Sequence, residues 1–219
     1  MLINIKKAMY KPTLLLLIAL LAAASATTYN LGATKDSTTS LSGAGGSDPC
    51  VIGGGLSYIL VNRPFVFGPP VINYGWTSFD LSNVSGTIIS ATLNLYGGCG
   101  ASCSFTGCTG STYSLHNTAN NWFETTSGSN HGLSGSNPSP TNPNCPNTPG
   151  EISLIGTATW SGSGISVDVT QAINNAQANG SISVKVTNTN TGNVNSGASF
   201  CSRESSNSSL RPKLTVVTV

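Results

Sequence analysis

Short segments of the chain alternate between apolar and polar residues with a period of two. The clearest lies at 88–96, where Ile89, Ala91, Leu93 and Leu95 are separated by single polar residues. This is the period of a half-buried β-strand. The same pattern, or a short apolar run between turn residues, occurs at 28–39, 56–61, 76–81, 113–116, 152–154, 165–169, 182–186 and 214–217. About nine strands without a βαβ rhythm predict an all-β fold, an antiparallel β-sandwich of the jelly-roll kind.

One segment departs from this period and predicts a short helix near 170–178. Ala172, Ile173 and Ala176 would share one helical face. Thr170 is a suitable N-cap, and Gly180 stands just past the expected end of the helix.

The N-terminus has the pattern of a secretory signal peptide. Lysines at 6, 7 and 11 precede an apolar run at 14–24, and Ala24-Ser25-Ala26 forms a cleavage site. The apolar run is shorter than the ~20 residues that span a bilayer. We expect residues 1–26 to be removed, which leaves one secreted, extracellular domain at 27–219 and no membrane span.

Removal of the leader would change the charge of the protein. The formal net charge is +2 for the whole chain, and it falls to −1 because three lysines and no acidic residue lie in the leader. A mature chain without a basic patch cannot neutralise a phosphate backbone, so we exclude nucleic acid as a partner.

All six cysteines lie in the mature region, and an oxidising compartment favours disulfide cross-links between them. They are Cys50, Cys99, Cys103, Cys108, Cys145 and Cys201. Three bridges among fifteen pairings are open, and the spacing of the central cysteines lacks the C-x2-C knuckle of structural zinc sites. Cys145 would tether the long Asn/Pro-rich loop expected at 127–150.

Charged residues are scarce but gather near the C-terminus. Arg203, Glu204 and Arg211 precede a strongly β-forming segment at 214–217. We interpret them as a structural ion cluster that holds an irregular loop against the last strand.

Five motifs follow one another in a recognisable order. They are ATKDST at 33–38, SFDLSNVSGTIISATLNLY at 78–96, WFE at 122–124, VDVTQAINNAQANG at 167–180 and FCSRESSNSSLRPKLTVVTV at 200–219. Together they resemble DNRLRE domains, which are also classed as carbohydrate-binding module family 96. The resemblance implies an extracellular β-sandwich that binds glycans or builds surface structures, without catalytic residues of its own. The cysteines and the segment 127–150 are not part of that pattern.

An active site has few residues to draw on, since the chain has seven acidic residues and two histidines. The G-x-S-x-G motif of acyl hydrolases does not occur in the sequence. Glu124 and Glu151 are the only carboxyl pair worth testing for glycoside hydrolysis, and neither has a local sequence that argues for a raised pKa. We therefore predict that the protein is not an enzyme.

No cofactor is expected, apart from a structural calcium ion that carboxylates could hold. Asp36, Asp80 and Asp168 are the candidate ligands, although no D-x-D-x-D spacing supports them. Asp80 and Asp168 could equally cap turns at strand ends.

Carbohydrate binding requires flat apolar faces beside hydrogen-bonding groups. Trp122, Trp160 and Tyr113 are the candidate stacking residues, since Trp76 lies within a strand pattern and Trp160 precedes a Gly/Ser turn where it could protrude. Asn83, Asn179 and Asn207 begin N-x-S/T sequons in expected turns and could carry N-glycans.

Two functions remain open on these grounds. The first is a secreted, non-catalytic carbohydrate-binding protein whose partner is an extracellular polysaccharide. The alternative is a structural protein of a cell surface, wall or extracellular filament, for which self-assembly would be expected.

Overall fold

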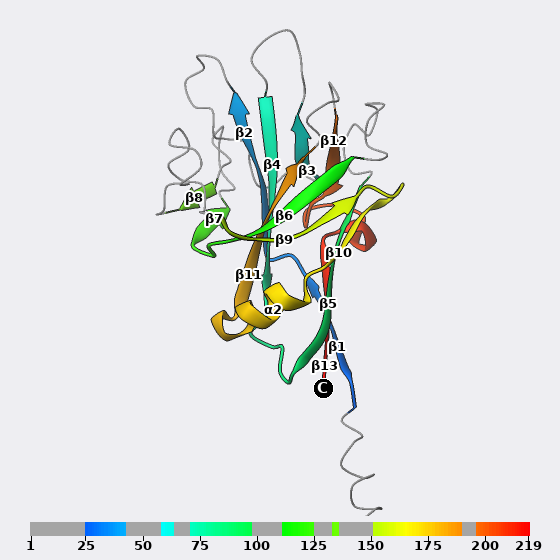
Figure 1. Cartoon of the computed structure of the whole chain (residues 1–219). Coiled ribbons are helices and arrows are strands. Elements are labelled where there is room, and N and C mark those ends of the chain that lie inside the picture. Colours follow the sequence, from blue (N-terminus) through cyan, green and yellow to red (C-terminus); the bar gives the residue numbers. More distant parts are fainter. Residues whose placement is uncertain are drawn as a thin grey trace, which may run out of the picture.

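The computed structural model describes residues 25–42, 58–63, 71–97, 111–124, 133–135, 151–189 and 196–219. These residues form antiparallel sheets and one short α-helix (Figure 1), which confirms the predicted all-β class. The finer assignment to the jelly-roll kind stays a prediction.

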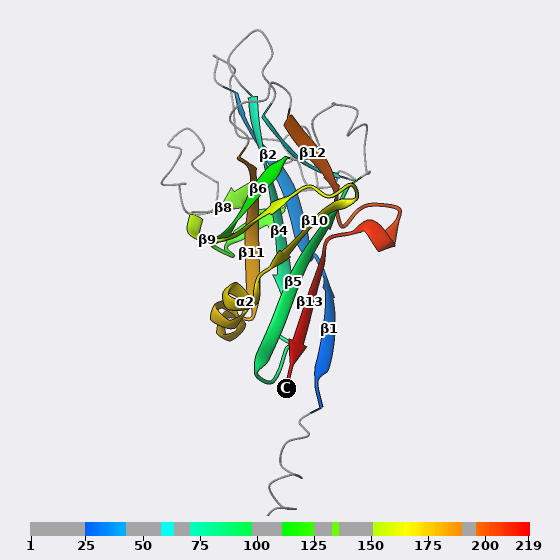
Figure 2. The ribbon, with the colours of Figure 1, turned by 45° about the vertical axis from the view of Figure 1, so that its right-hand side comes forward.

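The first sheet has four strands in the order β1-β13-β5-β10. Figure 2 shows β1, β13 and β5 side by side. Their bounds are β1 Thr27–Gly32, β5 Ile88–Tyr96, β10 Gly164–Asp168 and β13 Lys213–Thr218. The C-terminal strand is thus central in its sheet, paired with β1 on one side and β5 on the other.

The second sheet has five strands in the order β2-β4-β11-β6-β9. Their bounds are β2 Lys35–Ser42, β4 Val71–Asp80, β6 Thr112–Thr118, β9 Glu151–Thr159 and β11 Ser181–Asn188. β9 lies at the edge of this sheet and pairs with β6 through a register that shifts twice. These irregularities matter below, because β9 forms one wall of the candidate site.

Two short ribbons complete the sheets: β3 Tyr58–Arg63 with β12 Ser196–Cys201, and β7 Trp122–Glu124 with β8 Leu133–Gly135. A bridge between Gly97 and Phe200 joins the β12-β3 ribbon to the end of β5. The described residues contain thirteen strands, more than the nine predicted. The segment 28–39 is divided into two strands, and the Ser/Gly-rich β12 and the three-residue β7 and β8 give no alternating signal.

One apolar core lies between the sheets and takes side chains from both. Phe79 and Val184 contribute from the five-stranded sheet, and Leu93 and Val216 from the four-stranded sheet. Burying such side chains stabilises the fold by roughly 1.5–3 kcal/mol each.

Three aromatic rings meet where the sheets join. The ring centroid of Phe200 lies 5.3 Å from that of Tyr113 and 5.4 Å from that of Trp160. Trp160 also lies directly against Gly97, since a Cβ at that glycine would come within 2.0 Å of the indole ring. This aromatic junction therefore depends on a residue without a side chain at position 97.

Strand β5 follows the predicted period only in part. Ala91, Leu93 and Leu95 are buried as expected, but Ile89 is 52% exposed and Ile88 is buried in its place. A register shift in the pairing of β13 with β5, near Val217, accompanies this change of face. One irregular residue thus reverses the inside and outside positions at the strand end.

The predicted helix is confirmed as α2, Thr170–Ala176, followed by the 3-10 turn η1, Gln177–Asn179. Its end was predicted correctly, since Gly180 has a φ of 68°. The predicted N-cap is wrong by one residue, because Thr170 is the first helical residue and Val169 is the cap. Within the described part of the chain, no helix has the length and hydropathy needed to cross a membrane.

Cysteine positions are mostly beyond the described residues, which include Cys201 but none of the other five. Cys201 is buried and disulfide-bonded. The pairing scheme and the tether at Cys145 stay predictions. Of the expected loop at 127–150, the structure describes only 133–135, which is a strand rather than a loop.

The aromatic junction gives a direct test by glycine substitution. Gly97→Ala should destabilise the protein by about 1–3 kcal/mol, because its methyl group overlaps the Trp160 ring. Gly32→Ala is the matched control, since a Cβ there meets nothing within 4 Å, and it should change stability by less than about 0.5 kcal/mol. Equal melting temperatures for the two variants would show that the junction is not tightly packed.

Candidate functional site

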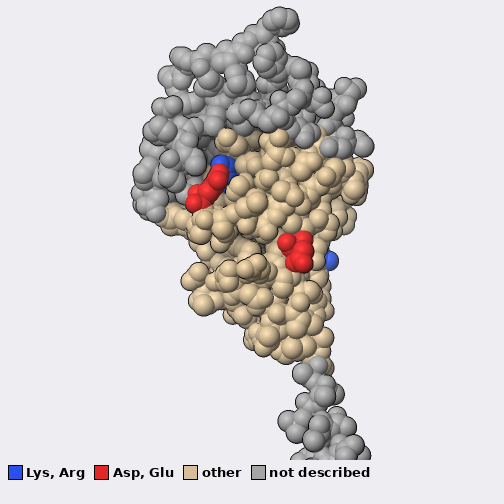
Figure 3. All heavy atoms as spheres, viewed as in Figure 1, with Lys and Arg blue, Asp and Glu red and all other residues tan. Residues whose placement is uncertain are grey.

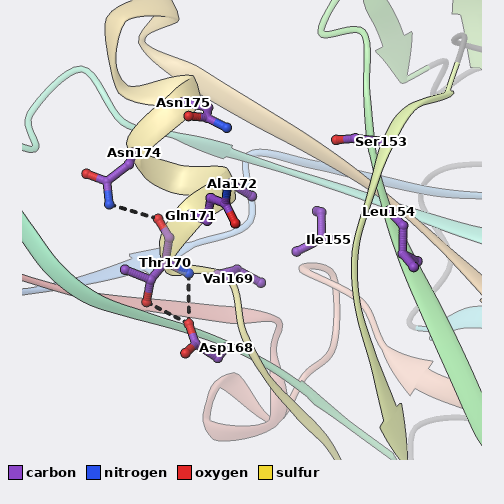
Figure 4. A pocket seen from close by; sticks show the side chains of 10 residues that line it. All are labelled: Ser153, Leu154, Ile155, Asp168, Val169, Thr170, Gln171, Ala172, Asn174 and Asn175. Carbon is purple, nitrogen blue, oxygen red and sulfur yellow. Dashed lines mark hydrogen bonds between the residues drawn. The ribbon is translucent and has the colours of Figure 1, made fainter.

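A cavity of about 650 Å³ lies between the edge strand β9 and helix α2. Its volume is within the ~300–1,000 Å³ range of ligand-binding pockets. Figure 4 shows its two walls, one from β9 and one from the end of β10 and α2. We call it the β9–α2 groove; its lining residues are Ser153, Leu154, Ile155, Asp168, Val169, Thr170, Gln171, Ala172, Asn174 and Asn175.

The polar wall of the groove begins with a turn at the end of β10. Asp168 Oδ1 accepts hydrogen bonds from the Thr170 amide at 2.9 Å and from its hydroxyl at 2.6 Å. The Thr170 hydroxyl in turn accepts from the Ala91 amide at 2.8 Å, which ties this turn to β5. The hydrogen bond from the Thr170 side chain and, to a smaller extent, the one from its backbone lower the pKa of Asp168 and keep its carboxylate ionised.

Three amide side chains follow on the exposed side of α2. Asn174 donates to the Thr170 carbonyl at 3.1 Å. Gln171 and Asn175 are exposed, and their amides have no hydrogen-bond partner among the described residues. The groove therefore offers unused donors and acceptors on a short, well-anchored element.

The opposite wall is aliphatic. Ile155 is half-buried and points from β9 toward α2 (Figure 4), whereas Leu154, which is 58% exposed, lies on the other side of the strand. Across the groove, Ala172 adds an apolar side chain on the α2 wall. An aliphatic surface facing unpartnered amides is a mixed apolar and polar site of the kind that binds small polar molecules.

A second cluster lies on the face of the five-stranded sheet that points away from the core. Lys185 is 7% exposed and forms an ion pair with Glu151. Its Nζ also lies 4.0 Å from the ring centroid of Tyr74 and 5.5 Å from that of Trp76. A buried ammonium group held by a carboxylate and two aromatic faces is a satisfied structural group.

Trp122 covers the same face and is fully buried. Its indole Nε1 donates to Ser183 Oγ at 2.9 Å. Lys35 Nζ donates to the Trp122 carbonyl at 2.9 Å and lies 5.1 Å from its ring centroid. Trp122 therefore anchors the segment after β6 to the sheet.

The predicted stacking residues are not at the surface. Trp122 and Tyr113 have no exposed area, and Trp160 is 5% exposed. The expectation that Trp160 protrudes is wrong, because its ring fills the aromatic junction against Gly97. Trp76 is buried as expected, although in the outer cluster with Trp122 rather than in the main core.

The three candidate calcium ligands each accept a structural hydrogen bond from a backbone amide. Asp36 is buried and accepts from the Arg203 amide at 2.5 Å. Asp80 accepts from the Ser82 amide at 2.8 Å, and Asp168 binds Thr170 as described. They do not converge, and the described part of the chain has no group of three potential metal ligands.

The C-terminal charged residues divide into two contacts instead of forming one cluster. Arg203 Nε lies 2.7 Å from Glu204 Oε1. Arg211 Nε donates to the Ser205 carbonyl at 2.9 Å and thereby holds the loop before β13. Because the Arg203–Glu204 pair is about one-third exposed, it contributes only ~0–1 kcal/mol.

All three sequon asparagines are exposed and lie in turns or a 3-10 helix. Asn83 follows β4, Asn179 ends η1 and Asn207 caps η2, Ser208–Leu210, through Ser209. Their modification stays a prediction.

Of the two carboxyl groups considered for glycoside hydrolysis, the structure describes the side chain of Glu151, and its pKa does not suit a general acid. Burial alone would raise the pKa of Glu151, but the hydrogen bond and charge of Lys185, together with His116, lower it overall. A general acid needs a raised pKa instead. The Glu124 side chain lies outside the described residues.

The family model of carbohydrate-binding module family 96 matches residues 72–218, and the chain therefore belongs to this family. The match includes both walls of the groove. A search of the curated proteins found no match.

The outer cluster predicts how stability depends on pH. His116 Nδ1 lies 3.5 Å from Glu151 Oε2, yet burial, aided by the charge of Lys185, lowers the His116 pKa below 6.5. A lowered pKa in the folded state means that the unfolded chain binds protons first as the pH falls. As the pH falls below ~6.5, the free energy of unfolding should therefore decrease because His116 becomes protonated more readily in the unfolded chain. Below pH ~4.5 it should decrease further, because the same holds for Glu151.

His116→Gln isolates the first of these steps, because it removes the titrating imidazole. Thermal unfolding between pH 7.5 and 5.5 should show a smaller loss of melting temperature in this variant than in the unmodified protein. A loss of the same size in both proteins would mean that His116 is not the group responsible.

Proposed function

We propose that this protein is secreted and binds an extracellular polysaccharide through the β9–α2 groove, without catalysing a reaction. The proposal includes removal of residues 1–26 and a single domain at 27–219. Family membership supports carbohydrate as the ligand class.

One observation carries the assignment to the groove. Gln171 and Asn175 are exposed and without hydrogen-bond partners among the described residues, and the half-buried Ile155 faces the same cavity (Figure 4). Sugars present hydroxyl groups at their edges and C–H groups on their faces, so they match both walls. The buried tryptophans offer no such surface.

Non-catalytic binding agrees with the state of the carboxylates that the structure describes. Asp168 and Glu151 both have a lowered pKa, and each already binds a specific partner. Neither is a proton donor near neutral pH.

The groove can be tested by removing its amides. The double variant Gln171→Ala, Asn175→Ala should weaken glycan binding on an array at least tenfold, or ~1.4 kcal/mol. Its melting temperature should stay near normal, because both side chains are exposed. Asn83→Ala, an exposed amide in a turn outside the groove, is the matched control and should bind normally.

Unchanged binding by the double variant would remove the groove from the proposal. Absence of binding to every glycan, together with assembly seen by sedimentation, would favour the alternative of a structural surface or filament protein.

Secretion predicts a mature N-terminus at Thr27 and no free thiol. Mass spectrometry after alkylation without reduction should show no labelled cysteine, in keeping with the disulfide at Cys201. Incorporation of label would show that the six cysteines do not form three bridges.

A further inference from the structure

The charges of the β9–α2 groove restrict what kind of glycan it can take. Among the described residues that line it, Asp168 is the single charged one, and none is a lysine or an arginine. The bonds from Thr170 hold this carboxylate in its ionised form through a lowered pKa. A uronate or sulfate group in the groove would meet a negative charge and no counter-charge.

The lysines of the neighbouring sheets do not supply that counter-charge. Lys185 is ion-paired with Glu151, and Lys35 binds the Trp122 carbonyl. Lys213 lies on β13, which β5 separates from β10 and Asp168. Figure 3 shows how sparse charged side chains are over the described surface in view.

The hydrogen-bonding groups of the groove suit hydroxyl groups instead. Asp168 Oδ1 already accepts two hydrogen bonds from Thr170, whereas Oδ2 makes no hydrogen bond within the described residues. A carboxylate accepts strong hydrogen bonds from hydroxyl groups. The amides of Gln171 and Asn175 both donate and accept, so they can bind neighbouring hydroxyls of one sugar.

The geometry points to an uncharged polysaccharide as the ligand of this groove, with Asp168 Oδ2 as its principal acceptor and Ile155 against the C–H face of a sugar. This inference rests on the proposed function. Since none of the lining residues that the structure describes is aromatic, hydrogen bonds rather than stacking give the specificity. Binding between neutral partners and one carboxylate depends little on ionic strength.

The experiment uses the mature full chain and two sets of soluble probes. Xylan, mannan and β-glucan are the neutral probes, and polygalacturonate and a sulfated galactan are the acidic ones. At least one neutral probe should bind, with an affinity that changes less than twofold between 20 and 300 mM NaCl. Both acidic probes should bind at least tenfold more weakly.

Asp168→Asn tests the acceptor, and Asp80→Asn is its matched control. Both carboxylates accept a backbone hydrogen bond two residues ahead, and both have a pKa lowered by that local contact, but only Asp168 lines the groove. Asp168→Asn should weaken neutral-glycan binding at least tenfold, whereas Asp80→Asn should bind normally.

Three outcomes have distinct meanings. Preference for the acidic probes, with tighter binding by Asp168→Asn, would overturn the inference and leave the proposed function intact. Normal binding of neutral glycan by Asp168→Asn would also overturn it. Failure of the unmodified protein to bind any probe would overturn the proposed function itself.

Discussion

The packing of Trp160 against Gly97 holds the two sheets and the β12-β3 ribbon together at one point. Tyr113 reaches this point from the five-stranded sheet and Phe200 from the β12-β3 ribbon, while Gly97 directly follows β5. The Trp160 amide also donates to the Ser111 carbonyl at 2.8 Å. Strands β9 and β10 both leave this point, and the groove lies where they reach α2. The position of the candidate site therefore depends on the aromatic junction.

This use of aromatic residues explains the character of the groove. Two tryptophans pack on the outer sheet face and the third fills the junction. The groove is left with aliphatic, amide and hydroxyl groups and one carboxylate. Such a surface gains little from stacking, so recognition depends on the placement of hydrogen-bonding groups. Their anchor is the Asp168–Thr170–Ala91 chain of hydrogen bonds, which fixes the start of α2 to β5.

Period-two alternation predicted the strands that bury one face, such as 165–169, and Gly180 marked the helix end correctly. The same signal failed where both faces are covered. Trp76 and Phe79 are both buried on β4, but on opposite sides of the sheet. Periodicity also gave no sign of the register shift that exposes Ile89. Hydrophobic periodicity identifies which residues of a strand share a face of the sheet. It does not show whether that face packs against the core, against an outer cluster or against solvent.

The candidate site was less predictable than the fold, because it combines residues 153–155 with 168–175. Asp168 was recognised as a candidate ligand, but for calcium rather than for sugar hydroxyls. Gln171 and Asn175 carried no distinctive signal, since exposed amides are common in a chain rich in asparagine. Only the approach of edge strand β9 to α2 distinguishes them from the others.

The most direct measurement is an NMR titration of the ¹⁵N-labelled protein with a soluble oligosaccharide. The side-chain amide signals of Gln171 and Asn175 should shift as the glycan is added, while the indole N–H signals of Trp76, Trp122 and Trp160 stay in place. Shifts confined to the indole signals, with those amides unchanged, would contradict the assignment of binding to the β9–α2 groove.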